Sequence, residues 1–125
     1  MTLQRFPADL DSAALSADAT AIGDTVYATV IPLGPDGEVA GQDISAQSKV
    51  AFEQLRDVLE SAGSDLDHLA HLTIYLTDIA RDREGFNEVY REYVAGPVPV
   101  RCAVGVAALA RPDMLVELTA VAARR

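Results

Sequence analysis

The sequence predicts an α+β fold in which two helices cover one face of a mixed β-sheet. Two segments carry an apolar stripe at helical spacing, and five others are rich in β-branched residues or alternate between apolar and polar positions. Gly, Pro and Asp residues that favour turns separate these segments. The predicted order is β-β-α-β-α-β-β, within a single domain that spans residues 1–125.

The first predicted elements are strands over residues 13–22 and 25–33. Gly23 and Asp24 lie between them and form a tight-turn pair, so the strands are expected to make a hairpin. The second strand is expected to stop at residues 34–37, where the sequence Gly-Pro-Asp-Gly is a strong turn signal.

The most regular helical pattern follows this hairpin. Either Asp43 or Ser45 can serve as the N-cap, and Gly63 provides a left-handed stop. The apolar stripe between them consists of Ala51, Leu55, Val58, Leu59 and Ala62. A second amphipathic helix is predicted over residues 82–95, where a Gly-Pro pair ends it.

Three further strands are predicted over residues 68–76, 100–109 and 114–122. The first alternates, but the last two are apolar on both faces, whereas a strand facing water carries polar residues on one side. Two helices can cover only one face of the sheet. The second face is therefore expected to be buried against another subunit, and self-association is the commonest arrangement.

The amino-acid composition of the chain argues against several classes of function. The net charge of −9, from 19 acidic and 10 basic side chains, disfavours nucleic-acid binding, which depends on cationic contacts to phosphates. The single Cys102 cannot form an internal disulfide. No basic-then-apolar leader opens the chain and no stretch approaches the length of a membrane span. We therefore expect a cytoplasmic protein that binds neither nucleic acid nor membranes.

Arg101 is the strongest candidate for a functional side chain. It shares a predicted strand face with Ala103, Gly105 and Ala107, whose small side chains leave space above the sheet. A permanently charged guanidinium in that space can grip a carboxylate through two hydrogen bonds. The alternative is a structural ion pair with one of the acidic residues, within the chain or across a subunit interface.

The other candidates give weaker signals. His68 and His71 supply too few ligands for a metal site, so no metal is expected. Cys102 could act as a nucleophile beside Arg101, but a small core residue is the simpler interpretation. Glu117 and Thr119 share a strand face and either could orient a water, although a glutamate there could equally pair with a cation.

Short motifs spread along nearly the whole chain carry a family resemblance. They are Gly23-Asp24-Thr25-Val26-Tyr27, Ile31-Pro32-Leu33, Asp36-Gly37-Glu38-Val39, Phe86-Asn87-Glu88-Val89-Tyr90, Tyr93, Pro99-Val100-Arg101, residues 104–109 (Val-Gly-Val-Ala-Ala-Leu) and Leu115-Val116-Glu117. Together they resemble the reactive intermediate deaminase family (Rid or RidA, YjgF-type, endoribonuclease L-PSP-like).

The resemblance implies a chorismate-mutase-like subunit, three of which pack their sheets into a central barrel in a homotrimer with ligand clefts between neighbouring subunits. In active relatives, an arginine matching Arg101 holds the carboxylate of a small reactive enamine or imine, such as 2-aminoacrylate. Water attacks the imine carbon and releases ammonia and a 2-oxo acid, as in a 2-iminobutanoate/2-iminopropanoate deaminase. No metal or organic cofactor takes part.

The chain departs from this family pattern at three positions that are expected to lie in or near the cleft. Ser16 stands where active members usually carry a tyrosine. Thr29-Val30 replaces a Ser-Gly-Gln segment and is one residue shorter. After the arginine, Cys102-Ala103 replaces Ser-Cys or Thr-Thr, which moves the cysteine to the opposite strand face.

The last strand also departs from the pattern. Relatives that hydrolyse enamines commonly carry a pair of glutamates; Glu117 matches the first and Thr119 replaces the second. A hydroxyl can hydrogen-bond water but cannot act as a carboxylate base. The substrate-binding set expected from the resemblance is Ser16, Val30, Cys102, Ala103, Glu117 and Thr119, around Arg101.

Three hypotheses follow. The first is an enamine/imine deaminase that uses Arg101 to anchor the substrate carboxylate. The second is a non-hydrolytic regulatory trimer that binds small carboxylates, motivated by Ser16 and Thr119. The third is a specialised pathway enzyme for a larger imine, because Ser16 enlarges the cleft. Nucleic-acid cleavage, sometimes linked to this family, fits badly with the charge of −9.

Overall fold

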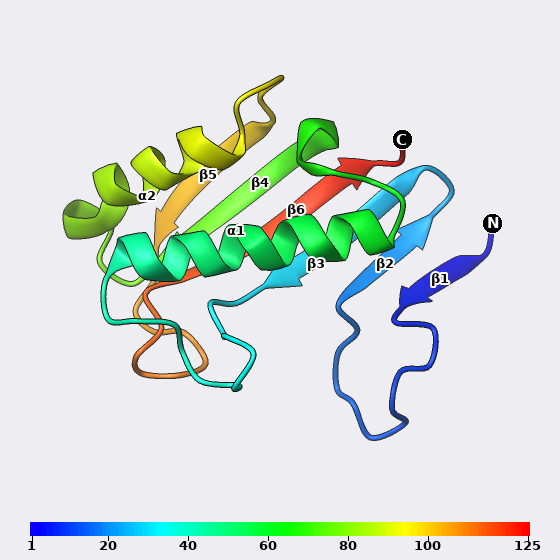
Figure 1. The fold of residues 1–125 in the computed structure, drawn as a ribbon, viewed down its shortest axis with the longest axis horizontal. Helices are drawn as coiled ribbons and strands as arrows, with labels where there is room; N and C mark the ends of the chain where they lie inside the picture. The colour runs from blue at the N-terminus through cyan, green and yellow to red at the C-terminus, as the bar shows by residue number, and fades with distance from the viewer.

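The computed structural model describes residues 1–125 as one sheet with two α-helices packed on one of its faces (Figure 1). The strands are β1 (Leu3–Phe6), β2 (Ala19–Ile22), β3 (Thr25–Val30), β4 (Leu69–Leu76), β5 (Val100–Gly105) and β6 (Val116–Ala123). Their order across the sheet is β1-β2-β3-β6-β4-β5. Only the β4–β5 pair is parallel, so the sheet is mixed, and the predicted α+β class is confirmed.

The N-terminal hairpin is confirmed, with different ends. Ile22 pairs with Thr25 across a two-residue turn, in which Gly23 has a φ of +57°. β2 begins only at Ala19, later than the predicted residue 13, because the backbone before it forms turns. The sequence pattern does not predict β1, because this strand is short and mostly exposed and has no alternation to reveal it.

β3 ends at Val30, earlier than the predicted residue 33. The strand stops because Pro32 has no N–H to donate to a neighbouring strand. Leu33 instead forms an isolated bridge with Val39 across the predicted turn, where Gly37 N–H donates to Gly34 O at 3.0 Å.

The first helix, α1 (Ile44–Ser61), confirms the predicted caps. The Asp43 carboxylate accepts a hydrogen bond from Ala46 N at 2.8 Å, so Asp43 rather than Ser45 is the N-cap. Gly63, just past the C-terminus, has a φ of +84°. A short 3₁₀ turn, η1 (Leu66–His68), then leads into β4.

The second helix, α2 (Ile79–Tyr93), connects the parallel strands β4 and β5. It begins before the predicted residue 82 because the Asp78 side chain caps it, accepting from Arg81 N at 3.1 Å. On β4, Leu72, Ile74 and Leu76 point toward the helices and are fully buried, as the alternation predicts.

β5 ends at Gly105, which corrects the predicted strand over residues 100–109. Its parallel ladder stops where β4 stops, at the Leu76–Gly105 pair. The last bond runs from Val106 N to Leu76 O, after which the chain leaves the sheet. The space expected above the small residues of this strand is also absent, because α2 fills it: a Cβ at Gly105 would lie 3.0 Å from Ile79 Cγ2.

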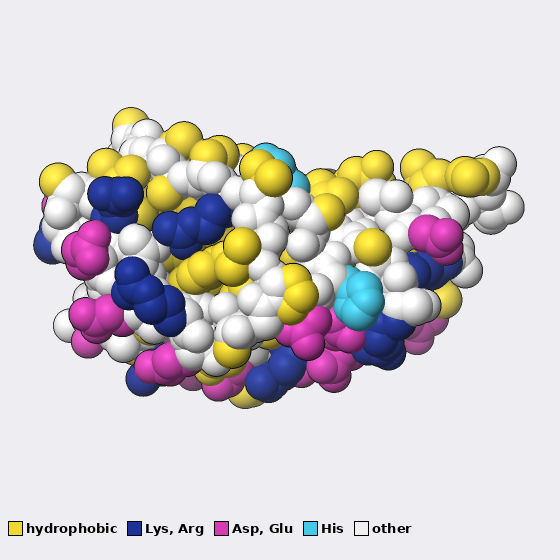
Figure 2. Space-filling model, turned by 90° about the horizontal axis from the view of Figure 1, so that it is seen from above, with side chains coloured by type: hydrophobic (Ala, Val, Ile, Leu, Met, Phe, Trp, Pro, Cys, Tyr) yellow, Lys and Arg dark blue, Asp and Glu magenta, His cyan; other side chains and the backbone are white.

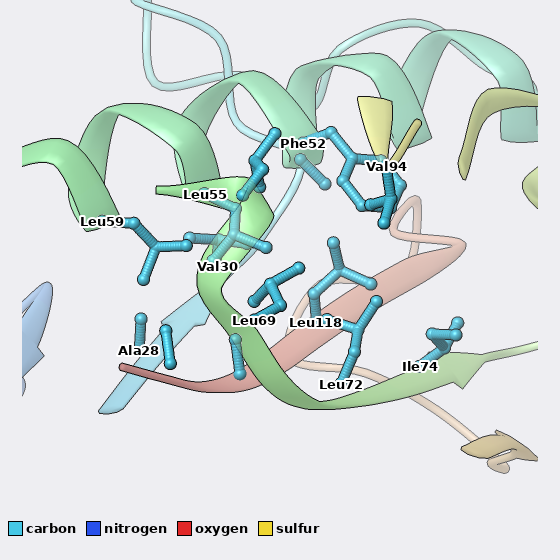
Figure 3. Close-up of a cluster of buried hydrophobic side chains, with 14 of the residues drawn as sticks. Ala28, Val30, Phe52, Leu55, Leu59, Leu69, Leu72, Ile74, Val94 and Leu118 are labelled. Carbon is cyan, nitrogen blue, oxygen red and sulfur yellow. The ribbon is translucent and has the colours of Figure 1, made fainter. Parts of the chain in front are cut away.

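The hydrophobic core lies between the two helices and the sheet (Figure 3). Phe52, Leu55 and Leu59 of α1 point down onto the sheet and meet side chains from the central strands β6 and β4. Leu69, Leu72, Ile74 and Leu118 are labelled in the same cluster. This packing leaves the opposite face of the sheet without a covering helix (Figure 1).

The uncovered face of the sheet carries several large apolar side chains that remain exposed. Ile22, Tyr27, Val100 and Val104 are between 37% and 69% exposed. Figure 2 shows charged side chains gathered on one side of the molecule and hydrophobic ones along the opposite side. Neither helix is long and apolar enough to cross a membrane.

Candidate functional site

Arg101 lies on β5 and points to the helix-covered side of the sheet, against α2. Its Nη2 donates to Asn87 Oδ1 at 2.6 Å, and its Cζ lies 4.5 Å from the centre of the Tyr90 ring. The parallel register places Arg101 beside the buried Leu72 of β4. An amide and an aromatic face therefore fix the guanidinium in position.

The Arg101 guanidinium has no acidic partner within the chain. None of the ion pairs includes it, and its Nη1 is buried without a hydrogen-bond acceptor. A buried donor without an acceptor is unfavourable. The structural ion pair considered as an alternative is thus absent within the single chain, and the side chain retains the capacity to bind an anion.

A hollow of about 430 Å³ adjoins Arg101 at the end of the molecule formed by α2 and β5. It is lined by Asn87, Tyr90, Arg91, Val94, Val98 and Pro99 together with Arg101. Figure 2 shows Lys and Arg side chains around an apolar hollow at this end. The lining combines cationic groups with apolar walls, which suits a small organic anion.

Tyr90 keeps its proton in this environment. Burial raises the pKa of the Tyr90 phenol above its usual value, and the nearby positive charge of Arg101 only partly opposes this. The phenol is therefore neutral at physiological pH. Its ring supports the guanidinium, and its hydroxyl remains available as a hydrogen-bond donor.

Cys102 points to the uncovered face of the sheet, opposite to Arg101, as the shift in sequence predicts. Its Sγ lies 4.0 Å from Thr73 Oγ1 of β4, and it is exposed rather than buried, which corrects the expected core position. Along the same row, Thr29 and Thr119 place their Oγ1 atoms 3.2 Å apart. A line of hydroxyl and thiol groups thus crosses β3, β6, β4 and β5.

Glu117 also lies on the uncovered face, where its register partner on β4 is Tyr75. It forms no ion pair, so the alternative of a glutamate bound to a cation is absent within the chain. Partial burial raises the pKa of the Glu117 carboxyl above its ordinary value of 4.5. Such a carboxyl exchanges protons closer to neutral pH than a free glutamate does.

Ser16 lies in the loop before β2, near the opposite end of the sheet from Arg101. It lines two adjoining hollows, of about 250 Å³ with Thr29 and Thr119 and about 590 Å³ with Val30 and Gln54. Its hydroxyl donates to Ala17 O at 3.0 Å. The structure therefore brings Ser16, Thr29 and Thr119 together.

Two other expected residues lie in the core. The side chain of Val30 is 5% exposed and points toward α1 (Figure 3), so only its backbone can reach a ligand. Ala103 packs against the core from β5. Within one chain, Arg101 faces α2 whereas Cys102, Glu117 and Thr119 occupy the other side of the sheet, so the predicted set divides into two groups.

The residues that hold Arg101 were not among the predicted site residues. Asn87 was visible in the sequence as a polar residue within the apolar stripe of α2, between Phe86 and Tyr90. It is buried at 8% exposure, and a buried amide requires hydrogen-bond partners. Arg91 carries no such signal, because a single Arg on a helix usually points into solvent.

Comparison with known proteins shows the family to which the chain belongs. The sequence model of the family described as "Endoribonuclease L-PSP" matches residues 8–124. The chain belongs to the endoribonuclease L-PSP family. A RutC family protein of Pyrococcus abyssi is 38% identical over 106 residues, which cover 83% of this chain and 82% of the relative. This assignment agrees with the resemblance of the sequence motifs to the Rid and YjgF proteins.

Solved structures of this family share the fold. RidA from the Antarctic bacterium Psychrobacter sp. superposes with a TM-score of 0.82 at 29% identity, covering 90% of this chain and 91% of that one. A YjgF protein from Neisseria meningitidis gives a TM-score of 0.86 at 26% identity, covering 100% and 97%. Because the second superposition covers the whole chain, the shared fold includes every strand of the sheet.

Proposed function

We propose that this family member hydrolyses small 2-imino acids and their enamine tautomers to 2-oxo acids and ammonia, with Arg101 anchoring the substrate carboxylate. The observation that carries the proposal is that the Arg101 guanidinium has no acidic partner, and that its buried Nη1 has no acceptor. A carboxylate would supply the missing acceptor and neutralise the charge. The RidA relationship supports the same assignment.

Orientation is the main contribution that such a site has to make. An imine carbon is already electrophilic, so the reaction needs a fixed substrate, a placed water and a proton for nitrogen. Asn87 and Tyr90 hold the guanidinium, whose planar fork would then fix the carboxylate in one plane. The hydrolysis adds water across C=N and expels ammonia, so no metal or organic cofactor is required.

The second part of the site is proposed to come from a neighbouring subunit. Glu117 and Thr119 cannot surround a ligand of Arg101 in the same chain, because they lie on the other face of the sheet. Ser16 is also remote from Arg101, because it lies beside β2 and β3, which are separated from β5 by β6 and β4. A homotrimer with the uncovered sheet faces packed into a central barrel would bury Ile22, Tyr27, Val100 and Val104 and leave clefts between subunits. The proposed setting is the cytoplasm, where pyridoxal-phosphate enzymes release such imines.

The proposal is tested by an assay that traps unhydrolysed imine. An amino-acid oxidase or a pyridoxal-phosphate dehydratase generates imines in situ, and semicarbazide captures what remains. We expect the protein to reduce the trapped imine in proportion to its concentration, with matching release of 2-oxo acid. Equal trapping with and without protein, for every amino acid tried, would remove the deaminase assignment.

Glu117 is expected to set the acidic limb of the pH profile. If its carboxylate accepts a proton from the attacking water, kcat/KM should fall as pH decreases through the raised pKa of Glu117, which lies above 4.5. Glu117→Gln should lower kcat/KM by about 10²-fold, the typical scale for general acid–base catalysis, and should abolish this limb. The measurement is kcat/KM between pH 4 and 8, and an unchanged limb in the variant would exclude this role.

A second candidate function is a trimer that binds small carboxylates without hydrolysing them. Its support is that Thr119 Oγ1 and Thr29 Oγ1 lie within hydrogen-bond distance of each other, so the position of the second family glutamate offers no free base. Calorimetry with 2-oxobutanoate would separate the candidates. Binding without any imine turnover would favour the regulatory role, and detectable turnover would exclude it.

A larger imine is the third candidate. Ser16 lines the two hollows of about 250 and 590 Å³, where a tyrosine side chain would occupy space. The same trapping assay, run with imines of increasing side-chain size, would show this preference as kcat/KM that rises with size.

A further inference from the structure

Arg91 places a second guanidinium on the hollow that adjoins Arg101. It follows Tyr90 on α2, one helical turn after Asn87, and lines the same hollow of about 430 Å³. It is exposed, and no hydrogen bond or ion pair holds it. Both arginines of the hollow therefore lack an acidic partner.

The lining of this hollow differs in charge from the chain as a whole. Acidic side chains outnumber basic ones by 19 to 10, yet no Asp or Glu lines the hollow. Glu92 follows Arg91 directly and Glu88 precedes it by about one helical turn, but neither pairs with it. The lining thus offers two guanidinium groups and no carboxylate, which favours a ligand with more than one negative charge.

The remaining walls of the hollow fit a short hydrocarbon chain. Val94, Val98 and Pro99 supply apolar surface, and Val98 is 73% exposed. A ligand with a carboxylate at each end could place its polar ends on the arginines and its methylene groups on this surface.

We propose that Arg91 binds a second carboxylate, so that the preferred substrate is a 2-imino dicarboxylic acid, the imine of an acidic amino acid. This inference rests on the proposed function, because it assigns the substrate class of the same site. Arg101 holds the 2-carboxylate next to the reacting carbon, and Arg91 holds the distal one. The reaction that supplies such a substrate is the two-electron oxidation of the amine of an acidic amino acid by an oxidase or a dehydrogenase.

The test compares two imines in three proteins. Glutamate oxidase generates 2-iminoglutarate, and a general amino-acid oxidase generates the uncharged-side-chain imine of alanine. The measured quantity is the ratio of kcat/KM for the diacid to that for the monoacid. In the wild type the diacid should be preferred, and Arg91→Gln should lower the ratio about tenfold, the scale of one charge-assisted hydrogen bond. The matched control is Arg83→Gln, which removes the same charge from an exposed position of α2 outside the hollow.

The outcomes separate this inference from the proposed function. A ratio in Arg91→Gln equal to that of the wild type, or lowered equally by Arg83→Gln, would overturn the role of Arg91 while the deaminase assignment stands. If neither imine is hydrolysed, the deaminase assignment fails and binding decides the inference. Calorimetry would then compare 2-oxoglutarate with 2-oxobutanoate. Tighter binding of the diacid, lost in Arg91→Gln, would support a dicarboxylate site, and equal affinities would overturn it.

Discussion

Arg101→Ala is expected to lower kcat/KM for imine hydrolysis by about 10²- to 10⁴-fold. The variant would remove two charge-assisted hydrogen bonds to the substrate carboxylate, each contributing roughly 1.5–3 kcal/mol, and each 1.4 kcal/mol corresponds to about a factor of ten. The semicarbazide assay measures the loss directly. An undiminished rate in a folded variant would contradict the anchoring role of Arg101.

Arg101→Lys is the informative companion to the alanine variant. Lysine keeps the positive charge but loses the planar fork and the contact with the Tyr90 ring. We expect a rate between those of the wild type and the alanine variant. If the lysine variant equals the wild type, charge alone suffices and the bidentate geometry is not used. Thermal unfolding and the oligomer mass, measured for both variants, would show that the loss does not reflect unfolding or dissociation.

Mixed oligomers can show whether each cleft takes residues from two subunits. Arg101→Ala and Glu117→Gln chains, each of low activity alone, are co-expressed with different affinity tags and purified through both. If Arg101 and Glu117 of one cleft come from different subunits, some mixed clefts regain both side chains and activity returns. No recovery would indicate that both residues act from the same chain, which the opposite faces of the sheet argue against.

The sequence was sufficient to predict the two helices and five of the six strands, because their signals are local and repeated. Asp43, the stripe of α1 and Gly63 each specify the same helix, and the structure contains all of them. The alternation of β4 also placed Leu72 and Ile74 on the buried face. Strand ends were less predictable, since they depend on partners. β5 stops at Gly105 because β4 stops at Leu76, and nothing in the sequence of β5 itself encodes that limit.

The candidate site was predictable only in part for the same reason. Arg101 stands out in the sequence because a charge interrupts an apolar strand. Its contacts come from α2, where Asn87 and Tyr90 lie far from it in the sequence. The sequence therefore suggested empty space above the small residues of β5, whereas the structure shows α2 packed there, with Asn87 and Tyr90 holding Arg101. Cys102 was expected to be buried, but its side chain lies on the uncovered face of the sheet and is exposed.

The structure links the core to the candidate site through an aromatic cluster. Phe52 of α1 lies 5.4 Å from the Tyr93 ring, 5.6 Å from Phe86 and 6.1 Å from Tyr90, measured between ring centres. Tyr90 in turn supports Arg101 at 4.5 Å. The position of the guanidinium thus depends on packing between the two helices as well as on its own strand.

Phe52→Ala is therefore expected to have the largest effect on stability and a further effect on activity. Phe52 is fully buried, and truncation of a buried phenylalanine typically costs about 3–5 kcal/mol, a large part of the roughly 5–15 kcal/mol that stabilises a domain. Urea unfolding at a fixed protein concentration measures this loss, since subunit association makes the midpoint depend on concentration.

Leu59→Ala is the matched control for this variant. Leu59 is also fully buried in α1, but it lies two turns after Phe52, near the C-terminus of the helix, where it packs toward Ala28 (Figure 3). Its truncation should cost about 2–5 kcal/mol. If the aromatic cluster positions Arg101, Phe52→Ala should lower kcat/KM well below Leu59→Ala when both are assayed fully folded at low temperature. Equal activities would mean that Asn87 holds the guanidinium without help from the Phe52 cluster.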